Sequence, residues 1–400
     1  MAYHRLLVLT NRAPIASYLF EEVRARGHEM IVIMTGSPQQ QPVLHPSAGY
    51  LPDIDTEAVL SLALRWGVTA AIYASTTSRV ASLRATAQLR QELSASGIRM
   101  VAHPSEVLDV TLDKWRCRQL LEGQGVGVPP GALAGCLADI SCEAKAIGYP
   151  VVLKLLDRSG GVGTHVVQDD SSLARLLGGT EGVLPDEPYL VEKALEGLEY
   201  SVEVLISDRG VMPLAVINKG RTDLHSPHPM GRPRVAPWTG DDGAQVLSTA
   251  VTAARAVGGC GVLEFDIIVS DRGPSVLEIN PRLGGVSFMG IYLGGYTSLD
   301  GLLEMALGDW QPLPAGDWRE RPVVAEVPVA SELTPDILRR LRSHPAVRVA
   351  APRSLLNSSG NLTLSAPDPV LLLSALDEIA TLGVSFVEED DLRLRVRALR

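Results

Sequence analysis

The stretch GVLEFDIIVSDRGPSVLEINPRLGG, residues 261–285, decides the fold of this chain. It holds two runs of alternating apolar and polar residues, separated by the turn-forming sequence SDRGP, which predicts an antiparallel β-hairpin. Successive side chains of a strand point to opposite faces. The alternation therefore places Glu264 and Asp266 on one face of the first strand. Folding at the turn brings Glu264 close to Glu278 and Asn280 of the second strand, on a single side of the hairpin.

This polar face favours a metal site. Carboxylates that gather at one place repel one another unless a cation lies between them, and hard oxygen ligands suit magnesium, which often shares its shell with nucleotide phosphates. The structural alternative is a hairpin whose polar face simply meets water. Arg282 follows the acidic strand directly and favours the metal site, because an arginine there can bind a carboxylate or phosphate beside the metal. Gly284 and Gly285 would let the backbone approach a ligand closely.

The composition excludes several classes of protein. With 36 basic and 46 acidic residues the chain carries a net charge of −10, which argues against a nucleic-acid surface. No apolar run approaches the roughly 20 residues of a membrane helix, and the N-terminus lacks the pattern of a signal peptide. The four cysteines form no CxxC pair, which is typical of free thiols in a reducing compartment. We expect a soluble cytoplasmic protein of two to four structural units.

Residues 1–110 alternate strand and helix signals, which predicts a parallel sheet with helices on both faces. The expected strands are residues 6–9, 30–34, 70–73 and 99–101, and the expected helices are residues 15–26, 56–66 and 79–96. No GxGxxG follows the first strand, where the sequence is TNRAP. We therefore do not predict a dinucleotide site, although the unit is Rossmann-like.

A second group of motifs lies in the middle of the chain. A strand ending at Lys154 leads into DRSGGVGT, residues 157–164, and glycine-rich turns of this type let backbone N–H groups point at phosphate oxygens. This is not a P-loop, because GxxxxGK[ST] is missing, and an ordinary hairpin turn is the structural alternative. Upstream, Thr111 and Asp113 are candidate N-caps of a helix that runs to about residue 123. Lys114 in its first turn fits the helix dipole poorly unless it serves a ligand.

Together these motifs resemble the ATP-grasp enzymes. The resemblance is carried by Lys114, by Lys154 with its glycine-rich segment, by Glu264, and by the run EINPR, residues 278–282, followed by LGG. Within that superfamily the chain most resembles the carboxylate–amine ligases, especially the L-amino-acid ligases that make dipeptides. The resemblance implies an ATP-grasp fold of the α/β class with an α+β central part. The implied parts are a Rossmann-like N-terminal domain (1–110), a small part with the glycine-rich lid (111–186), a large part with the adenine hinge and metal site (187–315) and a small C-terminal α/β domain (316–400).

The resemblance also implies a role for individual residues. The nucleotide would be held by Lys114, Lys154, Ser159, Gly160, Gly161, Gly163, Thr164, Glu192, Lys193, Leu195 and Glu199, of which the last takes the ribose hydroxyls. Magnesium, or manganese in its place, would be held by Glu264, Glu278 and Asn280. Arg282 would orient the substrate carboxylate and stabilise a tetrahedral intermediate, and Lys154 would assist catalysis by positioning the triphosphate.

The implied reaction is ATP-dependent formation of an amide bond through an acyl phosphate, with small-molecule acid and amine substrates and release of ADP and phosphate. A first alternative keeps the fold and activates bicarbonate, as biotin carboxylases and carbamoyl-phosphate enzymes do, although the chain lacks the Met-Lys-Met motif of a biotin carrier. A second alternative is a regulatory protein that binds ATP without turnover, which the intact acidic pair and lysines disfavour. Similar enzymes are commonly homodimers, and we expect one here.

The remaining segments carry less information. Residues 219–238 are basic and rich in proline, which predicts an irregular loop that either faces the substrate or is an ordinary surface excursion. His225 and His228 lack the further ligands of a zinc site. An amphipathic helix is expected at 240–256, and residues 287–292 with a helix at 298–307 should border the acceptor site. A linker at 312–316 leads to a last unit with strands near 323–329, 347–349 and 392–396, which would cover the site or form a dimer interface.

Overall fold

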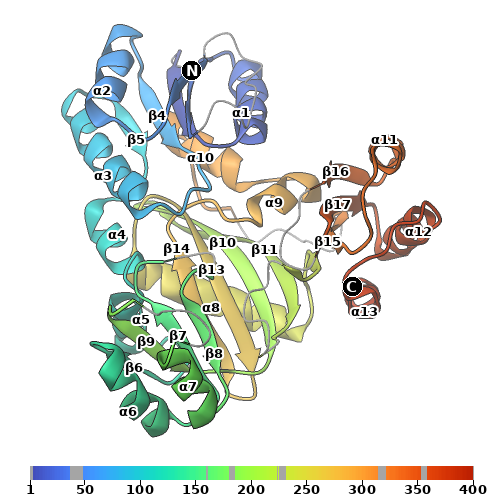
Figure 1. The fold of residues 1–400 in the computed structure, drawn as a ribbon. Coiled ribbons are helices and arrows are strands. Elements are labelled where there is room, and N and C mark those ends of the chain that lie inside the picture. Colours follow the sequence, from blue (N-terminus) through green and yellow to red (C-terminus); the bar gives the residue numbers. More distant parts are fainter. Residues whose placement is uncertain are drawn as a thin grey trace.

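The chain folds around three β-sheets. The computed structural model describes residues 3–36, 48–158, 161–179, 185–222, 224, 231–313, 321–352 and 358–399. Figure 1 shows the N-terminal sheet at one end of the molecule, a small sheet at the other end, and a long twisted sheet between them that continues into the C-terminal unit. The expected His225, His228 and linker residues 314–316 lie outside the described residues.

The N-terminal sheet is parallel, in the order β3-β2-β1-β4-β5, as the alternation of strands and helices predicts. Its central strands are apolar on both sides because helices cover both faces, so two separate apolar clusters form, one on each face. The strands are β1 (Arg5–Thr10), β2 (Glu29–Thr35), β3 (Ala48–Leu51), β4 (Ala70–Tyr73) and β5 (Arg99–Val101). The helices that follow them are α1 (Ala13–Ala25), α2 (Thr56–Arg65), α3 (Val80–Ala95) and α4 (Ser105–Thr111).

The small sheet is antiparallel, in the order β6-β9-β7-β8. Its elements are α5 (Lys114–Gly123), β6 (Gly131–Ala134), α6 (Leu137–Ile147), β7 (Val151–Leu155), β8 (Thr164–Val167), α7 (Asp170–Leu177) and β9 (Tyr189–Lys193). Asp113, one of the two expected N-caps, accepts hydrogen bonds from the N–H groups of Trp115 and Arg116 and so starts α5. Strand β9 pairs with both β6 and β7, so the pairing joins it to the small sheet although it follows the expected boundary at residue 186.

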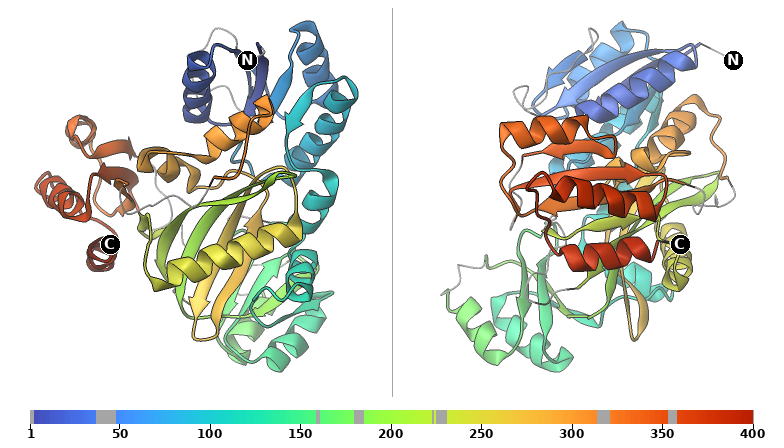
Figure 2. Two further views of the ribbon diagram at one scale, coloured as in Figure 1. Left: turned by 180° about the vertical axis from the view of Figure 1, so that it is seen from behind. Right: turned by 90° about the vertical axis from the view of Figure 1, so that its right-hand side faces the viewer.

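The large sheet has the order β14-β13-β10-β11-β12-β15-β17-β16 and is antiparallel throughout. Helix α8 covers one of its faces, as Figure 2 shows from behind, and α10 packs between the sheet and the N-terminal unit. The strands are β10 (Leu198–Ser207), β11 (Gly210–Arg221), β12 (Arg234–Ala236), β13 (Gly261–Ser270), β14 (Gly273–Asn280), β15 (Val323–Val329), β16 (Val347–Ala351) and β17 (Gly360–Ala366). The helices are α8 (Asp241–Val257), α9 (Ser287–Leu293) and α10 (Ser298–Leu307). The division of the chain into four domains stays a prediction.

Two local expectations are wrong. The predicted strand at 392–396 is part of helix α13 (Glu389–Arg397), which follows α11 (Pro335–Ser343) and α12 (Pro369–Ala380). The alternation of apolar and charged residues in this segment fits a strand, but it also fits one face of a helix. Leu392 and Val396 are buried one helical turn apart, while Leu394 between them is 63% exposed. The predicted irregular loop at 219–238 begins inside β11 and contains β12, so its described ends are strands.

None of the helices in the described ranges is both long enough and apolar enough to cross a membrane. Helices α1, α2, α6 and α8 bury one side against a sheet, whereas α10, between the large sheet and the N-terminal unit, is buried along most of its length.

A buried histidine joins the N-terminal unit to the large sheet. His103 follows β5, and its Nε2 atom lies 2.8 Å from the carbonyl oxygen of Val262 at the start of β13. The neutral ring therefore donates through Nε2, and Nδ1 has no hydrogen-bond partner in the described part of the chain. Gly259 approaches so closely that a Cβ there would lie 2.6 Å from Nδ1. Burial lowers the pKa of His103 to about 4.

We expect this histidine to make the protein sensitive to acid. An unfolded chain binds a proton on this ring near pH 6.5, whereas the folded chain binds it only near pH 4, so stability falls as the pH drops between these values, by about 2–3 kcal/mol. His103→Gln keeps a donor for Val262 but cannot titrate. Urea unfolding at about pH 7 and about pH 4.5 should give a smaller loss of stability for the variant than for the wild type. Equal losses would contradict the assignment.

Candidate active site

The hairpin β13–β14 gathers the acidic residues as its sequence predicts. Glu264 lies opposite Asn280 and Asp266 lies opposite Glu278 in the register of the two strands, with an irregularity after Asp266. Directly opposed residues project from the same face of a sheet. Glu203 of β10 lies opposite Glu264 on the other side, so four acidic residues and an amide share one face of three neighbouring strands.

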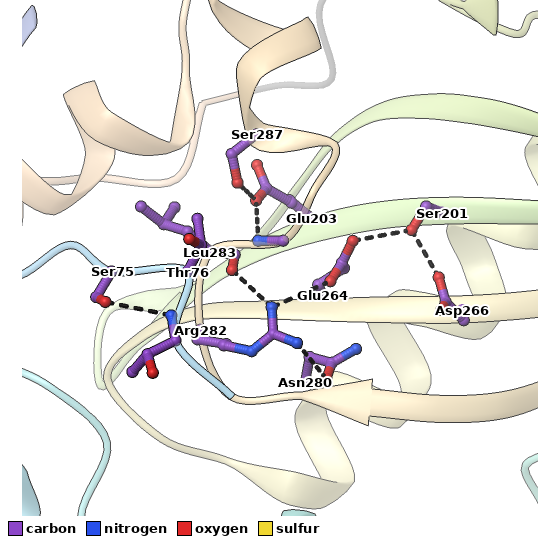
Figure 3. Close-up of polar contacts among 12 residues, drawn as sticks. Ser75, Thr76, Ser201, Glu203, Glu264, Asp266, Asn280, Arg282, Leu283 and Ser287 are labelled. Atoms are coloured by element: carbon purple, nitrogen blue, oxygen red, sulfur yellow. Dashed lines mark hydrogen bonds and ion pairs between the residues drawn. The ribbon is translucent and has the colours of Figure 1, made fainter. Parts of the chain in front are cut away.

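The centre of this face is buried. Glu264 and Asp266 both contact the hydroxyl group of Ser201, at 3.2 Å and 2.7 Å, and Figure 3 shows the three side chains pointing toward one another. Burial and the neighbouring Asp266 carboxylate raise the pKa of Glu264. Burial alone would raise the pKa of Asp266 as well, but the ammonium group of Lys219, 2.7 Å away, holds that pKa below its usual range.

The loop after β14 closes over Glu264. The N–H of Gly284 donates to Oε1 of Glu203 at 3.3 Å, and the hydroxyl of Ser287 donates to the same oxygen. A Cβ built on Gly284 would lie 2.0 Å from the Glu264 carboxylate carbon, so residue 284 can carry no side chain without displacing Glu264. The close backbone approach that LGG predicts is therefore made to a carboxylate of the protein itself.

Arg282 lies at the edge of the acidic face. Its guanidinium donates to Oδ1 of Asn280 at 3.0 Å and to the carbonyl of Leu283 at 2.9 Å, and it lies 3.9 Å from Glu264. These contacts hold the guanidinium group of Arg282 beside the candidate metal ligands, where it can bind an anion.

Two lysines reach the hairpin from the small sheet. The Nζ atom of Lys114, at the start of α5, lies 3.1 Å from Oε1 of Glu278 and also donates to the carbonyl of Arg158. Lys154 of β7 lies 2.7 Å from Oε2 of Glu192. Burial alone would lower the pKa of Lys154, but Glu192 and Glu278 raise it above its usual range. Both lysines are paired with carboxylates.

The charged side chains of the expected adenine hinge bind other groups of the protein. Glu192 is buried on β9 and its carboxylate lies between Lys154 and Arg118, which is 3.5 Å away. Lys193 donates to the carbonyls of Gly148 and Tyr149, at 3.0 Å and 2.6 Å. Leu195 lies between β9 and β10.

Glu199, expected at the ribose, is buried on β10 with the guanidinium of Arg232 3.6 Å away. The acidic residues of the expected hinge, Glu192 and Glu199, are thus paired with basic residues of the protein.

The glycine-rich segment connects β7 to β8. Lys154 pairs with Thr164 across the two strands, and Gly161 and Gly163 adopt φ angles of 79° and 69°, the left-handed region that favours glycine. The expected phosphate ligands Ser159 and Gly160 lie outside the described residues.

A cavity of about 20 Å³ lies between the small sheet and the hairpin. That volume is close to what one water molecule requires. Its lining includes Lys114, Cys117, Arg118, Glu192 and Glu278.

The N-terminal sheet faces the same site with the carboxyl ends of β1 and β4, which is the switch point of its strand order. Asn11 after β1 accepts hydrogen bonds from the N–H and the hydroxyl of Thr76 after β4, at 3.0 Å and 3.2 Å. Figure 3 places Ser75 and Thr76 beside Arg282. Arg12 stacks on the ring of Phe288 with its guanidinium carbon 5.4 Å from the centroid.

Lys219 is a functional candidate that reasoning from the sequence missed, because the prolines around it predicted an irregular loop. It lies on β11, and its side chain is 5% exposed. The low lysine content of the sequence could have drawn attention to Lys219. The chain contains only five lysines among its 36 basic residues, and all but Lys145 lie at this site. They are Lys114, Lys154, Lys193 and Lys219.

The model of the ATP-grasp domain matches residues 111–286. These residues are an ATP-grasp domain. ATP-grasp enzymes are ligases that use ATP and magnesium, and the matched range contains the lysines, the acidic hairpin and Arg282. The family and the fold expected from the sequence are therefore confirmed, while the roles of the individual site residues stay predictions.

The relatives and solved structures that resemble this chain are several different enzymes. The chain is 29% identical over 264 residues to a carbamoyl-phosphate synthase of Methanobrevibacter smithii, which covers 64% of this chain and 69% of that protein. It spans 18% and 23% of the larger carbamoyl phosphate synthase chains that it matches. Carboxyaminoimidazole ribonucleotide synthase of Aspergillus clavatus, complexed with ATP, is 16% identical with a TM-score of 0.71, over 100% of this chain and 99% of that chain.

An L-amino acid ligase of Bacillus licheniformis is equally similar in identity, at 16%, with a TM-score of 0.68 over 96% of this chain and 98% of that chain. At this identity the likeness to the solved structures shows a shared fold. The ATP-grasp fold is thus shared, and the substrate has to be argued from the site.

The residues fit a divalent cation. In the described ranges no three His, Cys, Asp or Glu side chains are arranged to hold a metal ion, and the candidate set instead combines two carboxylates with the amide oxygen of Asn280. These are hard oxygen donors that leave room for water and phosphate in the shell of magnesium. The raised pKa of buried Glu264 reports a carboxylate whose charge is incompletely balanced by the protein.

We expect Gly284→Ala to disrupt this arrangement. The added methyl group would displace the Glu264 carboxylate, and binding of ATP with magnesium should weaken by about 10- to 100-fold. Isothermal titration calorimetry measures this directly. Gly290→Ala is the matched control, since a Cβ there meets no atom within 4 Å. Unchanged affinity in a folded Gly284→Ala protein would contradict the role of Glu264.

Proposed function

We propose that this chain is an ATP-dependent carboxylate–amine ligase, which activates an acid as an acyl phosphate and joins it to an amine. The observation that carries the proposal is the meeting of three components on one sheet face. Lys114 of helix α5 reaches Glu278 beside the Lys154–Glu192 pair of the small sheet, the acidic hairpin presents Glu264 and Asn280, and Arg282 lies between them and the N-terminal unit.

Nucleotide binding would proceed by exchange of charge partners. Lys114 and Lys154 are held by Glu278 and Glu192. A triphosphate offers both lysines stronger anionic partners, so its entry separates the two pairs and opens the space between the sheets. Glu278 is then released for another cation. Because each lysine has an anionic partner both before and after the exchange, no lysine has to be buried without a partner.

Glu264, Glu278 and Asn280 would hold magnesium. When bound, the ion supplies positive charge that neutralises the phosphate oxygens during phosphoryl transfer. The remaining chemistry rests on the residues of the chain. Arg282 and Lys219 lie on either side of Glu264 and bring positive charge to the place where the acid meets the γ-phosphate.

The two steps balance without a covalent enzyme intermediate. A carboxylate oxygen of the substrate bonds to the γ-phosphorus of ATP while the bond to the bridging oxygen of ADP breaks. The amine nitrogen then bonds to the acyl carbon, phosphate leaves with the carbon–oxygen bond pair, and the amine loses a proton to solvent. Arg282 orients the carboxylate in the first step and stabilises the oxyanion of the tetrahedral intermediate in the second.

The substrates would lie at the switch point of the N-terminal sheet. The loops after β1 and β4 are tied together by Asn11 and Thr76 and face Arg282. Arg12, fixed by its stacking on Phe288, places a further cation there, which suits a substrate with a second acidic group.

Bicarbonate is the second candidate acid. It is favoured by the similarity to carbamoyl-phosphate synthase, since carbamoyl phosphate contains a carboxylated nitrogen. The same residues would activate it, because bicarbonate presents the carboxylate geometry that Arg282 binds. The two candidates differ in the substrates that trigger ATP turnover.

Phosphate release from ATP and magnesium, measured across single and paired amino acids and with bicarbonate and ammonia, identifies the acid. We expect release that requires one acid and one amine, with the matching amide seen by mass spectrometry. Glu278→Gln should lower the rate by at least about 10²-fold, because it removes a carboxylate from the phosphoryl-transfer centre. Glu332→Gln, the same change at an exposed position, should leave it unchanged.

Release with bicarbonate and without an organic acid would favour the second candidate. Absence of turnover in the whole matrix would sink the dipeptide form of the proposal.

Arg12→Ala tests the location of the substrates. Removing the stacked cation should raise the KM of one organic substrate by about tenfold, equivalent to 1.4 kcal/mol, while the KM of ATP stays the same. Arg65→Ala is the matched control, because Arg65 also stacks on an aromatic ring, that of Trp66, but on helix α2. Steady-state kinetics separates the two constants. A change confined to the KM of ATP would place Arg12 at the nucleotide instead.

A further inference from the structure

The last helix of the chain contacts the strand that carries Lys219. Strands β11 and β12 pair at Asn218 and Val235, and just beyond β12 the N–H of Trp238 donates to the carbonyl of Val216 at 2.8 Å. Arg395 of α13 contacts the backbone of both segments and is 4% exposed. Its Nη1 atom donates to the carbonyls of Pro233, at 3.0 Å, and of Asn218, at 3.3 Å. One guanidinium thereby ties the two strand ends together.

The same side chain fixes the backbone on both sides of Lys219. Nη1 of Arg395 also lies 3.4 Å from Oδ1 of Asn218, which accepts a hydrogen bond from the N–H of Gly220 at 2.8 Å. Gly220 has a φ of 89° and packs so closely on the guanidinium that an added Cβ would lie 3.3 Å from its central carbon. The residues before and after Lys219 are therefore both held by Arg395.

Arg395 is itself held firmly. Its Nε donates to Oδ2 of Asp391 at 2.7 Å, one turn earlier on α13. A continuous set of contacts then runs from Asp391 through Arg395 and Asn218 to Lys219, and from Lys219 to Asp266 beside Glu264. A lysine has a flexible four-carbon stem, so the place of its ammonium depends on a fixed backbone.

We propose that Arg395 is a positioning residue for Lys219, through which the C-terminal unit sets the geometry of the active site. The chemical role of Lys219 rests on the proposed ligase function, whereas its placement by Arg395 does not. Loss of Arg395 would leave the buried carbonyls of Asn218 and Pro233 without their donor and free the turn at Gly220. The ammonium of Lys219 would then leave Asp266.

The test uses the scarcity of lysine in this chain. Brief acetylation of the full chain, read by peptide mass spectrometry, reports all five lysines in one experiment. In the wild type, Lys145, 62% exposed, should react fully and Lys219, 5% exposed, should react least. Arg395→Ala should raise acetylation of Lys219 several-fold and leave Lys114 and Lys154 as they were. Turnover, where present, should show a lower kcat with an unchanged KM for ATP.

Arg393→Ala is the matched control. Arg393 lies on the same helix and pairs with Asp377 and Glu389, each at 2.8 Å, away from β11. Its loss should not change the labelling of Lys219. Asp391→Asn serves as a milder variant if Arg395→Ala fails to fold, and it should raise the labelling of Lys219 in the same direction.

Three outcomes would overturn the proposal. They are unchanged labelling of Lys219 in folded Arg395→Ala, an equal rise at Lys114 and Lys154, which indicates general loosening, and an equal effect of Arg393→Ala. Because labelling requires no turnover, absence of ATP-dependent activity would count against the ligase and leave this result intact.

Discussion

The structure depends on keeping several carboxylates buried on one face of three strands. Glu203, Glu264 and Asp266 would repel one another in an apolar interior, and each is stabilised in a different way. Asp266 has the ammonium of Lys219, Glu203 has a backbone N–H and a hydroxyl, and Glu264 is left with partners that only partly balance it. At the proposed metal site that remaining imbalance would favour a bound cation. A closer internal ion pair would remove it, stabilising the fold at the expense of cation binding.

The lysines of the proposed nucleotide site are also balanced by opposite charges of the protein. Lys114 and Lys154 are each paired with a carboxylate, and the two pairs differ in origin. Lys114 begins helix α5, whose Cys117 and Leu121 pack in the core of the large sheet that carries Glu278, whereas Lys154 and Glu192 come from neighbouring strands of the small sheet. The proposed nucleotide site is therefore framed by the core of the large sheet on one side and by the small sheet on the other.

The success of reasoning from the sequence varied with the range of the interaction. The hairpin could be predicted because a period of two residues decides which face Glu264 and Asn280 share, whatever surrounds them. The N-cap at Asp113 is equally local. Lys219 and Arg395 could not be predicted, because each has its place through contacts with residues 47 and 177 positions away. In Leu392–Val396 the pattern fits both a strand and one face of a helix, and packing against β12 and α12 decided between them.

The position of β12 between β11 and β15 has a consequence for dissecting the molecule. Strand β12 lies outside the acidic hairpin, yet its other edge pairs with β15, which comes after residue 320. In a fragment limited to residues 111–286, β12 would lack its partner strand β15. The carbonyls of Asn218 and Pro233 would also lack the hydrogen bonds from Arg395. Open strand edges recruit other chains. The stretch that identifies the family is therefore smaller than the unit that folds, and truncation at its borders would produce aggregates rather than a minimal enzyme.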